Sequence, residues 1–283
     1  MGSSQMVSGM GQVGRALDAG LVAHGRHKVH VLSPSVRDYR ECQGDITFLE
    51  IDYDNPDAIS RTLEDPNIDT VMCATGGSLR RGQQCPNWSY PRPNTSTTTR
   101  RFVISSYDML HLPDSNSPIR HVDVNPLAKY TFRGIEEVEE TDSLYTRVVN
   151  GWFLDYYGMP YWQTHLHPWI NVVNGEEATF IKIQDLDRFV ARLVDLVNWL
   201  KIRSILVNGL SLNDLMKPAQ QTRAWEDSIG RTLFASEPPS IDLCDVNEAF
   251  FAHIHHLAGC GNYQVPPGAN LNGKFPDIRL ATA

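Results

Sequence analysis

The sequence lacks the features of membrane, nucleic-acid-binding and secreted proteins. It has no run of about 18 apolar residues, so no segment is suited to cross a membrane. Its 33 acidic residues exceed its 25 basic ones, for a formal net charge of −8, and it has no lysine- or arginine-rich block of the kind that binds nucleic acids. The N-terminus lacks the charged-then-apolar layout of a secretory signal. We therefore expect neither a membrane nor a nucleic acid as a partner.

Cysteine is scarce, and several catalytic motifs are missing. The five cysteines are odd in number, widely spaced and never in a Cys-x-x-Cys pair, which is typical of reduced thiols in a cytoplasmic protein. Without a G-x-S-x-G, H-E-x-x-H or Walker motif, hydrolase and phosphoryl-transfer functions have no support. The run His253-Ile254-His255-His256 has no carboxylate cluster beside it, so we interpret it as a partly exposed helix or loop and expect no metal site.

What the sequence does contain is a G-x-G-x-x-G run near its start, between a strand-like stretch and an apolar, helix-like one. In such a run Gly9 allows a tight turn, Gly11 lets the backbone approach a pyrophosphate, and Gly14 lets the helix pack closely on the strand. The free N–H groups at the helix N-terminus then face the phosphate. A glycine-rich turn without a ligand is the alternative, but this context favours a dinucleotide site. Its predicted cofactor-binding residues are Gly9, Gly11, Gln12, Val13 and Gly14.

Strand-like and helix-like stretches alternate after the glycine run. This alternation predicts an α/β fold with a doubly wound parallel sheet of the Rossmann type, in which ligands bind beyond the carboxyl ends of the strands. Further strands are expected at residues 29–32, 47–51, 70–75, 101–105, 144–149, 178–183 and 205–207. Helices are expected at residues 56–63, with Asn55 as the N-cap, and at 126–140 and 186–196.

The end of the second predicted strand indicates which dinucleotide is bound. NAD sites usually place an acidic residue there, whereas NADP sites supply an arginine. Here Ser33 is followed by Arg37 with no acidic residue between them, which favours NADP over NAD unless Arg37 is simply a solvated loop residue. Asp52, after the third strand, could accept a hydrogen bond from adenine or cap the next turn. Ser33, Arg37 and Asp52 join the predicted cofactor site, together with Thr75 and Gly76 at the end of the fourth strand.

Residues 78–100 do not fit the alternation. A crossover helix is expected there, but three prolines and a Ser/Thr run exclude a regular amphipathic helix over most of the stretch. It is either a loop over the cofactor site or a stretch read in a shifted frame.

Two features of the second half point to a substrate side. Lys129 lies on the predicted helix after the fifth strand, where a lysine could hold ribose hydroxyls or act as a general acid, although a solvated surface lysine is the simpler interpretation. Residues 152–162 are densely aromatic and follow the sixth strand directly. They predict either an aromatic wall for a flat substrate or a core cluster. The predicted lining residues are Trp152, Phe153, Tyr156 and Tyr157.

Together these segments resemble the NmrA-like and isoflavone-reductase-like branch of atypical short-chain dehydrogenases, over about residues 5–220. The resemblance is carried by the glycine run, by Ile51-Asp52-Tyr53, by residues 101–105, by the stretch from Tyr145 to Pro160, and by residues 185–190. The second-half segments are most similar to fungal averufin-oxidase-like proteins, which occur with aromatic polyketide pathways such as sterigmatocystin and aflatoxin formation.

The resemblance implies an NAD(P)-binding Rossmann core at residues 1–150 and a substrate-side region at 151–283, with the remaining strands and a small C-terminal substrate-capping region. It assigns a catalytic role to Lys129, because Arg133 follows at the spacing of the branch's reductases, and it places Ser105 in the cofactor site. Two features depart from the family. Asn125 stands where short-chain dehydrogenases usually have a tyrosine, and residues 78–100 do not match the family's helix.

We therefore expect an NADP-dependent oxidoreductase that tailors an aromatic polyketide in a mycotoxin or pigment pathway. The alternative is a non-catalytic sensor of NADP or NAD of the NmrA type, which the missing tyrosine would permit. A third option is a rearrangement or ring-opening catalyst without net redox chemistry. The sequence leaves the exact substrate, the reaction direction and the oligomeric state open.

Overall fold

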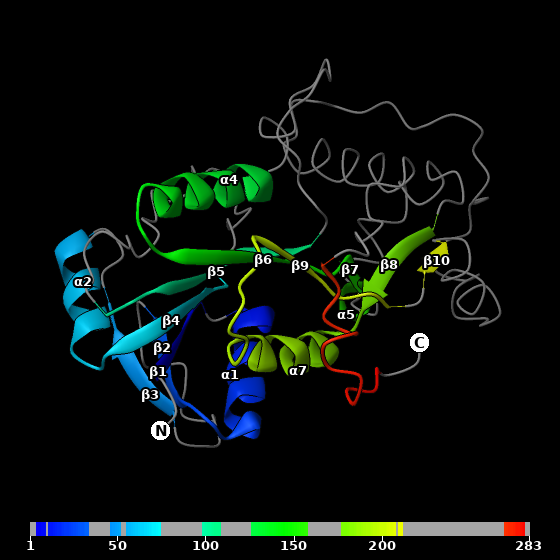
Figure 1. The fold of residues 1–283 in the computed structure, drawn as a ribbon, viewed down its shortest axis with the longest axis horizontal. Helices are drawn as coiled ribbons and strands as arrows, with labels where there is room; N and C mark the ends of the chain where they lie inside the picture. Colours follow the sequence, from blue (N-terminus) through cyan, green and yellow to red (C-terminus); the bar gives the residue numbers. More distant parts are fainter. Residues whose placement is uncertain are drawn as a thin grey trace, which may run out of the picture.

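The computed structural model describes residues 4–9, 11–33, 46–51, 55–74, 98–108, 126–157, 177–207, 209–211 and 269–280. Within these ranges the chain forms a seven-stranded parallel sheet and a separate three-stranded sheet (Figure 1). None of the helices in the described ranges combines the length and the apolar character needed to cross a membrane.

The large sheet has the strand order β3-β2-β1-β4-β5-β6-β9, and every neighbouring pair is parallel. The order reverses at β1, so the chain winds outward in both directions from the centre of the sheet. The predicted doubly wound parallel sheet is confirmed. Its strands are β1 (Ser4–Ser8), β2 (Lys28–Ser33), β3 (Ile46–Glu50), β4 (Ile68–Cys73), β5 (Arg101–Asp108), β6 (Leu144–Val149) and β9 (Ile202–Ser204).

Helices cover both faces of this sheet, and each face has its own apolar core. On one face lie α1 (Gln12–His24) and α7 (Ile183–Leu193), and on the other lie α2 (Pro56–Glu64) and α4 (Pro126–Glu139) (Figure 1). Because successive strand residues point to opposite faces, a single strand can contribute to both cores. In β4, for example, Met72 joins the α1–α7 side and Cys73 joins the α2–α4 side.

The second sheet, in the order β10-β8-β7, starts directly after β6. Its strands are β7 (Trp152–Phe153), β8 (Glu177–Ile181) and β10 (Gly209–Ser211), and the short helix α5 (Leu154–Tyr157) follows β7. Gly151 turns the chain between the two sheets with a φ of 75°, and a Cβ there would overlap the carbonyl oxygen of Thr179. Only glycine therefore fits this turn.

A side chain from α5, which follows β7 of the second sheet, contacts α7, which covers one face of the large sheet. The backbone N–H of Ile183, the first residue of α7, donates a 2.8 Å hydrogen bond to Oδ2 of Asp155. Lys182, the N-cap of α7, provides no side-chain cap of its own. Asp155 therefore caps α7 from 28 residues earlier in the chain.

Most predicted elements lie within a few residues of the observed ones, and Asn55 caps α2 as expected, because its side chain accepts a 3.1 Å hydrogen bond from the Ala58 N–H. The strand predicted at residues 205–207 is wrong. The ladder instead runs through Ile202–Ser204, where Arg203 and Ser204 are buried polar residues that an apolar pattern does not mark. The helix α7 also begins at Ile183, three residues before the predicted start.

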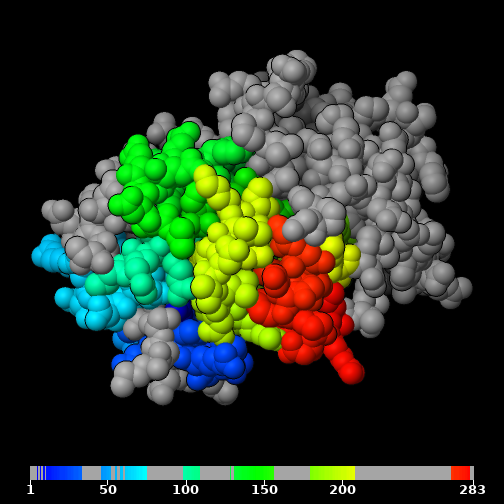
Figure 2. All heavy atoms as spheres, in the orientation of Figure 1, coloured from blue at the N-terminus to red at the C-terminus, as the bar shows by residue number. Residues whose placement is uncertain are grey.

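The C-terminal segment 269–280 belongs to the α1–α7 core. Leu271 and Phe275 are buried there, and the Leu271 N–H donates a 2.8 Å hydrogen bond to the carbonyl oxygen of Ser204. Figure 2 shows this segment, in red, lying against the yellow-green residues that include β9. The second half of the chain thus completes the sheet layer that the first half begins.

One carboxyl group on α1 is buried without a hydrogen-bond partner among the described residues. Asp18 is only 3% exposed, and neither of its carboxylate oxygens has a hydrogen-bond partner within the described part of the chain. Burial raises the pKa of this carboxyl to about 8. The folded protein therefore holds a proton on Asp18 that the unfolded chain releases near pH 4.

This burial predicts a pH-dependent stability. The contribution of protonated Asp18 is fully present below about pH 4 and is lost as the pH rises through about 8. We expect Asp18→Asn to stabilise the fold by about 1–3 kcal/mol at pH 8.5 and to have little effect at pH 4.5. Urea denaturation at both pH values measures this. Asp142→Asn, at an exposed aspartate, is the control. An equal effect of Asp18→Asn at both pH values would contradict the prediction.

Candidate functional site

The glycine run forms the turn between the carboxyl end of β1 and the start of α1. Gly9 has a φ of 109°, a conformation that side chains other than hydrogen rarely permit, and its N–H points to the carbonyl oxygen of Leu32 at 3.5 Å. The turn lies at the centre of the sheet, between β2 and β4. This is the position at which the strand order reverses and where open α/β sheets bind ligands.

The surroundings of Gly14 exclude a side chain, whereas those of Gly11 do not. A Cβ on Gly14 would overlap the carbonyl oxygen of Gly9 and lie 3.6 Å from Cβ of Ala74, so the protein's own packing requires glycine there. Gly11 has an ordinary extended conformation, with φ −65° and ψ −176°, and a Cβ there would meet no atom of the described residues within 4 Å. The described part of the fold therefore does not need a glycine at this position. The open space beside Gly11 fits the close approach of a pyrophosphate.

The N-terminus of α1 presents donors to the same space. The first helical bond runs from the Arg15 N–H to the Gly11 carbonyl oxygen at 3.1 Å, so the N–H groups of Gln12, Val13 and Gly14 have no acceptor within the helix. Gly11 is the N-cap, no side chain caps the helix, and its first turn contains no acidic residue. These groups and the positive end of the helix dipole form an arrangement that binds phosphate.

The remaining predicted cofactor residues are only partly described. Ser33 lies at the carboxyl end of β2, is buried, and accepts a 3.0 Å hydrogen bond at its carbonyl oxygen from the Ile51 N–H. It therefore lies on the same sheet edge as the glycine turn. Four other predicted residues, Arg37, Asp52, Thr75 and Gly76, lie outside the described residues.

Ser105 and the helix of Lys129 are joined by a hydrogen bond. The Thr131 hydroxyl donates a 2.8 Å hydrogen bond to the Ser105 carbonyl oxygen, which fixes the first half of α4 against the carboxyl half of β5. Lys129 is in the first turns of α4, but its side chain lies outside what the structure describes. Arg133, one turn later, forms a 3.0 Å ion pair with Glu137 on the same helix.

The aromatic residues after β6 divide into two pairs. Trp152 and Phe153 are each only 6% exposed. The Trp152 ring contacts Phe180 edge-on at 5.8 Å, and Phe153 is part of the α1–α7 core, as the core-cluster interpretation expects. Tyr156 and Tyr157 are on α5, and their side chains are outside the described set.

Two hydroxyl groups at the end of β5 were not among the predicted site residues. The strand was expected to end at Ser105 but continues to Asp108, which brings Ser106 and Tyr107 to its carboxyl end. Both residues are buried, and neither hydroxyl has a hydrogen-bond partner within the described ranges. Burial, with a smaller contribution from Cys73, raises the pKa of Tyr107 well above its ordinary value. The β-propensity of tyrosine was the available signal.

No protein-family model matches the sequence. The chain is 25% identical over 226 residues to Oxidoreductase BOA1 of Botryotinia fuckeliana (strain B05.10), covering 76% of this chain and 73% of that protein. Among solved structures, AtPrR2 with NADP+ and (+)pinoresinol superposes with a TM-score of 0.72 at 14% identity, covering 99% of this chain and 96% of that chain.

Two further solved structures share the fold. The ternary complex of leucoanthocyanidin reductase from Vitis vinifera has a TM-score of 0.66 at 17% identity, with 99% and 96% coverage. A nucleoside-diphosphate-sugar epimerase from Staphylococcus aureus has a TM-score of 0.64 at 14% identity, with 99% and 97% coverage. At these identities the likeness establishes that this chain has the Rossmann-type fold of these proteins.

The different roles of the two glycines predict different mutant behaviour. Gly11→Ala should change the stability of the ligand-free protein by less than about 1 kcal/mol, because the added methyl meets nothing. It should nevertheless weaken NADPH binding at least about tenfold by blocking the diphosphate. Gly14→Ala should destabilise the ligand-free fold itself by about 1–3 kcal/mol. Urea denaturation and fluorescence titration with NADPH measure both effects. NADPH binding of wild-type strength in Gly11→Ala would contradict the proposed phosphate position.

Proposed function

We propose that this chain is an NADP-dependent oxidoreductase. The observation that carries the proposal is Gly11, whose lack of a side chain the fold does not require, beside the uncapped N-terminus of α1 at the reversal of the strand order. The names of the similar proteins support it. Botryotinia fuckeliana BOA1 is called an oxidoreductase, and AtPrR2 and a leucoanthocyanidin reductase were solved with NADP+ or NADPH.

Lys129 is the proposed catalytic residue. The bond from Thr131 to Ser105 holds the start of α4 at the carboxyl end of β5, on the same sheet edge as the glycine turn. From there the ammonium group of Lys129 would hold ribose hydroxyls or polarise a substrate oxygen and give it a proton. A bound nicotinamide supplies the hydride chemistry. Ser105, Arg37 and Asp52 are the proposed further contacts to the cofactor.

The proposed substrate is an aromatic polyketide, as in sterigmatocystin- or aflatoxin-type pathways. The resemblance of residues 145–160 to averufin-oxidase-like proteins supports this class, and AtPrR2 was solved with the aromatic compound (+)pinoresinol. Trp152 and Phe153 would anchor the aromatic segment in the core and form one wall of the substrate site. Tyr156 and Tyr157 would contact the aromatic rings of the substrate. In this proposal residues 1–150 bind the cofactor and residues 151–283 form the substrate side.

The second candidate function is a non-catalytic sensor of NADP or NAD. The observation that favours it is Asn125, four residues before Lys129, where a catalytic tyrosine usually stands in short-chain dehydrogenases. A sensor would bind the dinucleotide without consuming it, so turnover separates the two functions.

Replacing Lys129 tests the enzyme proposal. Lys129→Ala should lower kcat/KM for an NADPH-dependent reduction of an aromatic polyketide by about 100-fold or more, as for loss of a general acid. The dissociation constant of NADPH should change much less. Lys201→Ala is the matched control. Lys201 is exposed and forms an ion pair with Glu139, the last residue of α4, whereas Lys129 lies near the first residue of that helix. A sensor would show no NADPH consumption by either variant or by the wild-type protein.

Replacing Arg37 tests the choice of cofactor. If its guanidinium binds the 2′-phosphate, Arg37→Ser should weaken NADPH binding by about 10–100-fold, the value of a charged hydrogen bond, and leave NADH binding nearly unchanged. Parallel calorimetric titrations with NADPH and NADH measure this ratio. A wild-type protein that prefers NADH would overturn the assignment of Arg37.

A further inference from the structure

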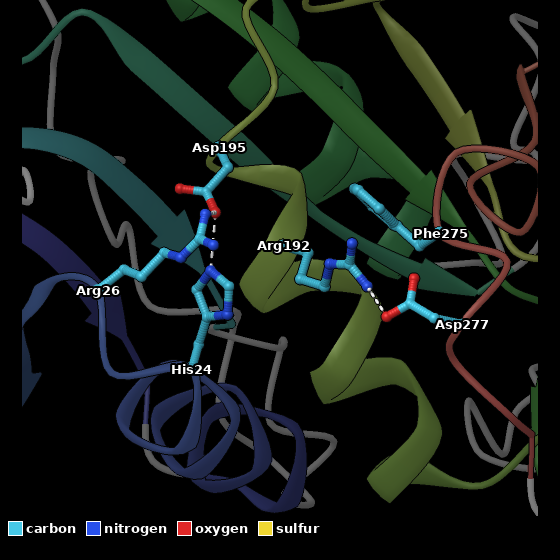
Figure 3. A pocket seen from close by; sticks show the side chains of 6 residues that line it. All are labelled: His24, Arg26, Arg192, Asp195, Phe275 and Asp277. Atoms are coloured by element: carbon cyan, nitrogen blue, oxygen red, sulfur yellow. Dashed lines mark hydrogen bonds and ion pairs between the residues drawn. The ribbon is translucent and has the colours of Figure 1, made fainter.

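Three potential metal ligands converge at the end of α1 that is remote from the glycine turn. Nε2 of His24 lies 2.7 Å from Oδ2 of Asp195, and Nε2 of His27 lies 2.9 Å from Oδ1 of the same carboxylate. The potential ligand atoms of the three residues all lie within 4.8 Å of one another. Figure 3 shows His24 and Asp195 pointing toward each other across the space between α1 and the end of α7.

The backbone fixes these positions. His24 is the last residue of α1, and Gly25 ends the helix in the left-handed conformation, with φ 68° and its N–H bonded to the Leu21 carbonyl oxygen at 3.2 Å. This turn brings the His27 ring to 5.9 Å from the His24 ring. Asp195 follows the last turn of α7, where its N–H bonds to the carbonyl oxygen of Arg192 at 3.1 Å.

The donor set matches the ligands of zinc. Two imidazole nitrogens and one carboxylate oxygen, with a fourth position for water, are a common set around Zn²⁺. Bond lengths of about 2.0–2.1 Å in a tetrahedron separate neighbouring ligand atoms by about 3.3 Å. The contacts of 2.7 and 2.9 Å, which reach different oxygens of the carboxylate, would lengthen by a fraction of an ångström when the ion enters. The two histidine nitrogens, which lie within 4.8 Å of each other, would adjust to the same separation.

The three side chains are held in place by packing, and the space beside them has room for a metal ion and water. His27, His24 and Asp195 expose 7%, 15% and 27% of their side chains, so all three are held by packing but remain reachable. A pocket of about 490 Å³ opens beside them, lined by His24, Arg26, Arg192, Asp195, Phe275 and Asp277. Water in this pocket could complete the coordination.

Two positive charges nearby would oppose a cation, and the structure accounts for both. Arg192 is paired with Asp277 at 2.5 Å and lies over the Phe275 ring at 4.4 Å, so its charge is already compensated (Figure 3). Arg26 lies 3.2 Å from Asp195, but its side chain is 68% exposed and can turn into solvent when a metal replaces it.

We propose that His24, His27 and Asp195 bind a divalent transition-metal ion of the Zn²⁺ class, which clamps the C-terminal end of α1 to that of α7. At 1.5 Å per residue, the 13 residues of α1 place this site about 20 Å from the glycine turn. The metal is therefore structural and takes no part in the chemistry at the other end of the helix.

The test uses the full chain, freed of metal and titrated with Co²⁺ and Zn²⁺. Co²⁺ should give the visible absorption of a four-coordinate site, Zn²⁺ should displace it, and Zn²⁺ should raise Tm. Since outer-shell partners alone are worth about 10–100-fold in metal affinity, loss of a direct ligand in Asp195→Asn or His24→Gln should weaken binding by at least about 100-fold. Asp277→Asn is the matched control, because it removes a carboxylate from the same pocket without removing a ligand. Since it also leaves Arg192 without its ion-pair partner, it should weaken binding several-fold, far less than the loss of a ligand.

Three outcomes would overturn the proposal. The first is a wild-type protein that binds neither ion at micromolar concentrations. The second is metal binding that survives in Asp195→Asn, which would place the ion at other histidines, such as His253, His255 and His256. The third is equal weakening in Asp277→Asn, which would indicate a general effect of charge. An unchanged NADPH affinity and circular dichroism spectrum show that each variant is folded.

Discussion

The close contact between α1 and β1 is the constraint on which the rest of the structure depends. The helix can begin at Gln12, three residues after Gly9, because Gly14 offers no side chain against the Gly9 carbonyl oxygen. This contact aims the first N–H groups of α1 at the edge where the strand order reverses. A wider spacing would move those donors away from this edge, so one missing methyl group sets both the packing of the central layer and the direction in which the helix presents its free N–H groups.

A second close contact, between α1 and α7, fixes the position of the helix further along its length. At Gly20, a Cβ would come within 2.8 Å of the Asp187 carbonyl oxygen, so α1 and α7 approach each other backbone to backbone. Around them, Leu17, Leu21, Phe189 and Val190 form the largest apolar core in the described residues. The same packing aligns the ends of the two helices, where His24, His27 and Asp195 meet. The glycine turn and the histidine cluster are thus the two ends of one rigid helix pair.

Elements that depend on a local sequence pattern were predicted, whereas contacts between residues far apart in the chain were not. Most buried residues of β2, β4 and β6 are apolar or β-branched, so these strands are visible in the sequence despite a few polar residues. The glycine turn is visible because it depends on the spacing of three glycines. Strand β9 and the end of β5 were missed because their buried residues include Arg203, Ser204 and Ser106, whose polarity suggests a loop. The pairing of His24 with Asp195 joins residues 171 positions apart, and no local pattern contains it.

The cap that Asp155 provides to α7 determines how the molecule can be divided. Without α5, the first N–H of α7 loses its acceptor, and without α7, the apolar face that β1, β4 and β5 share with α1 is exposed to water. A truncation at residue 150 would remove both. Residues 1–150 are therefore not an autonomous folding unit, and the two sheets should melt in a single cooperative transition.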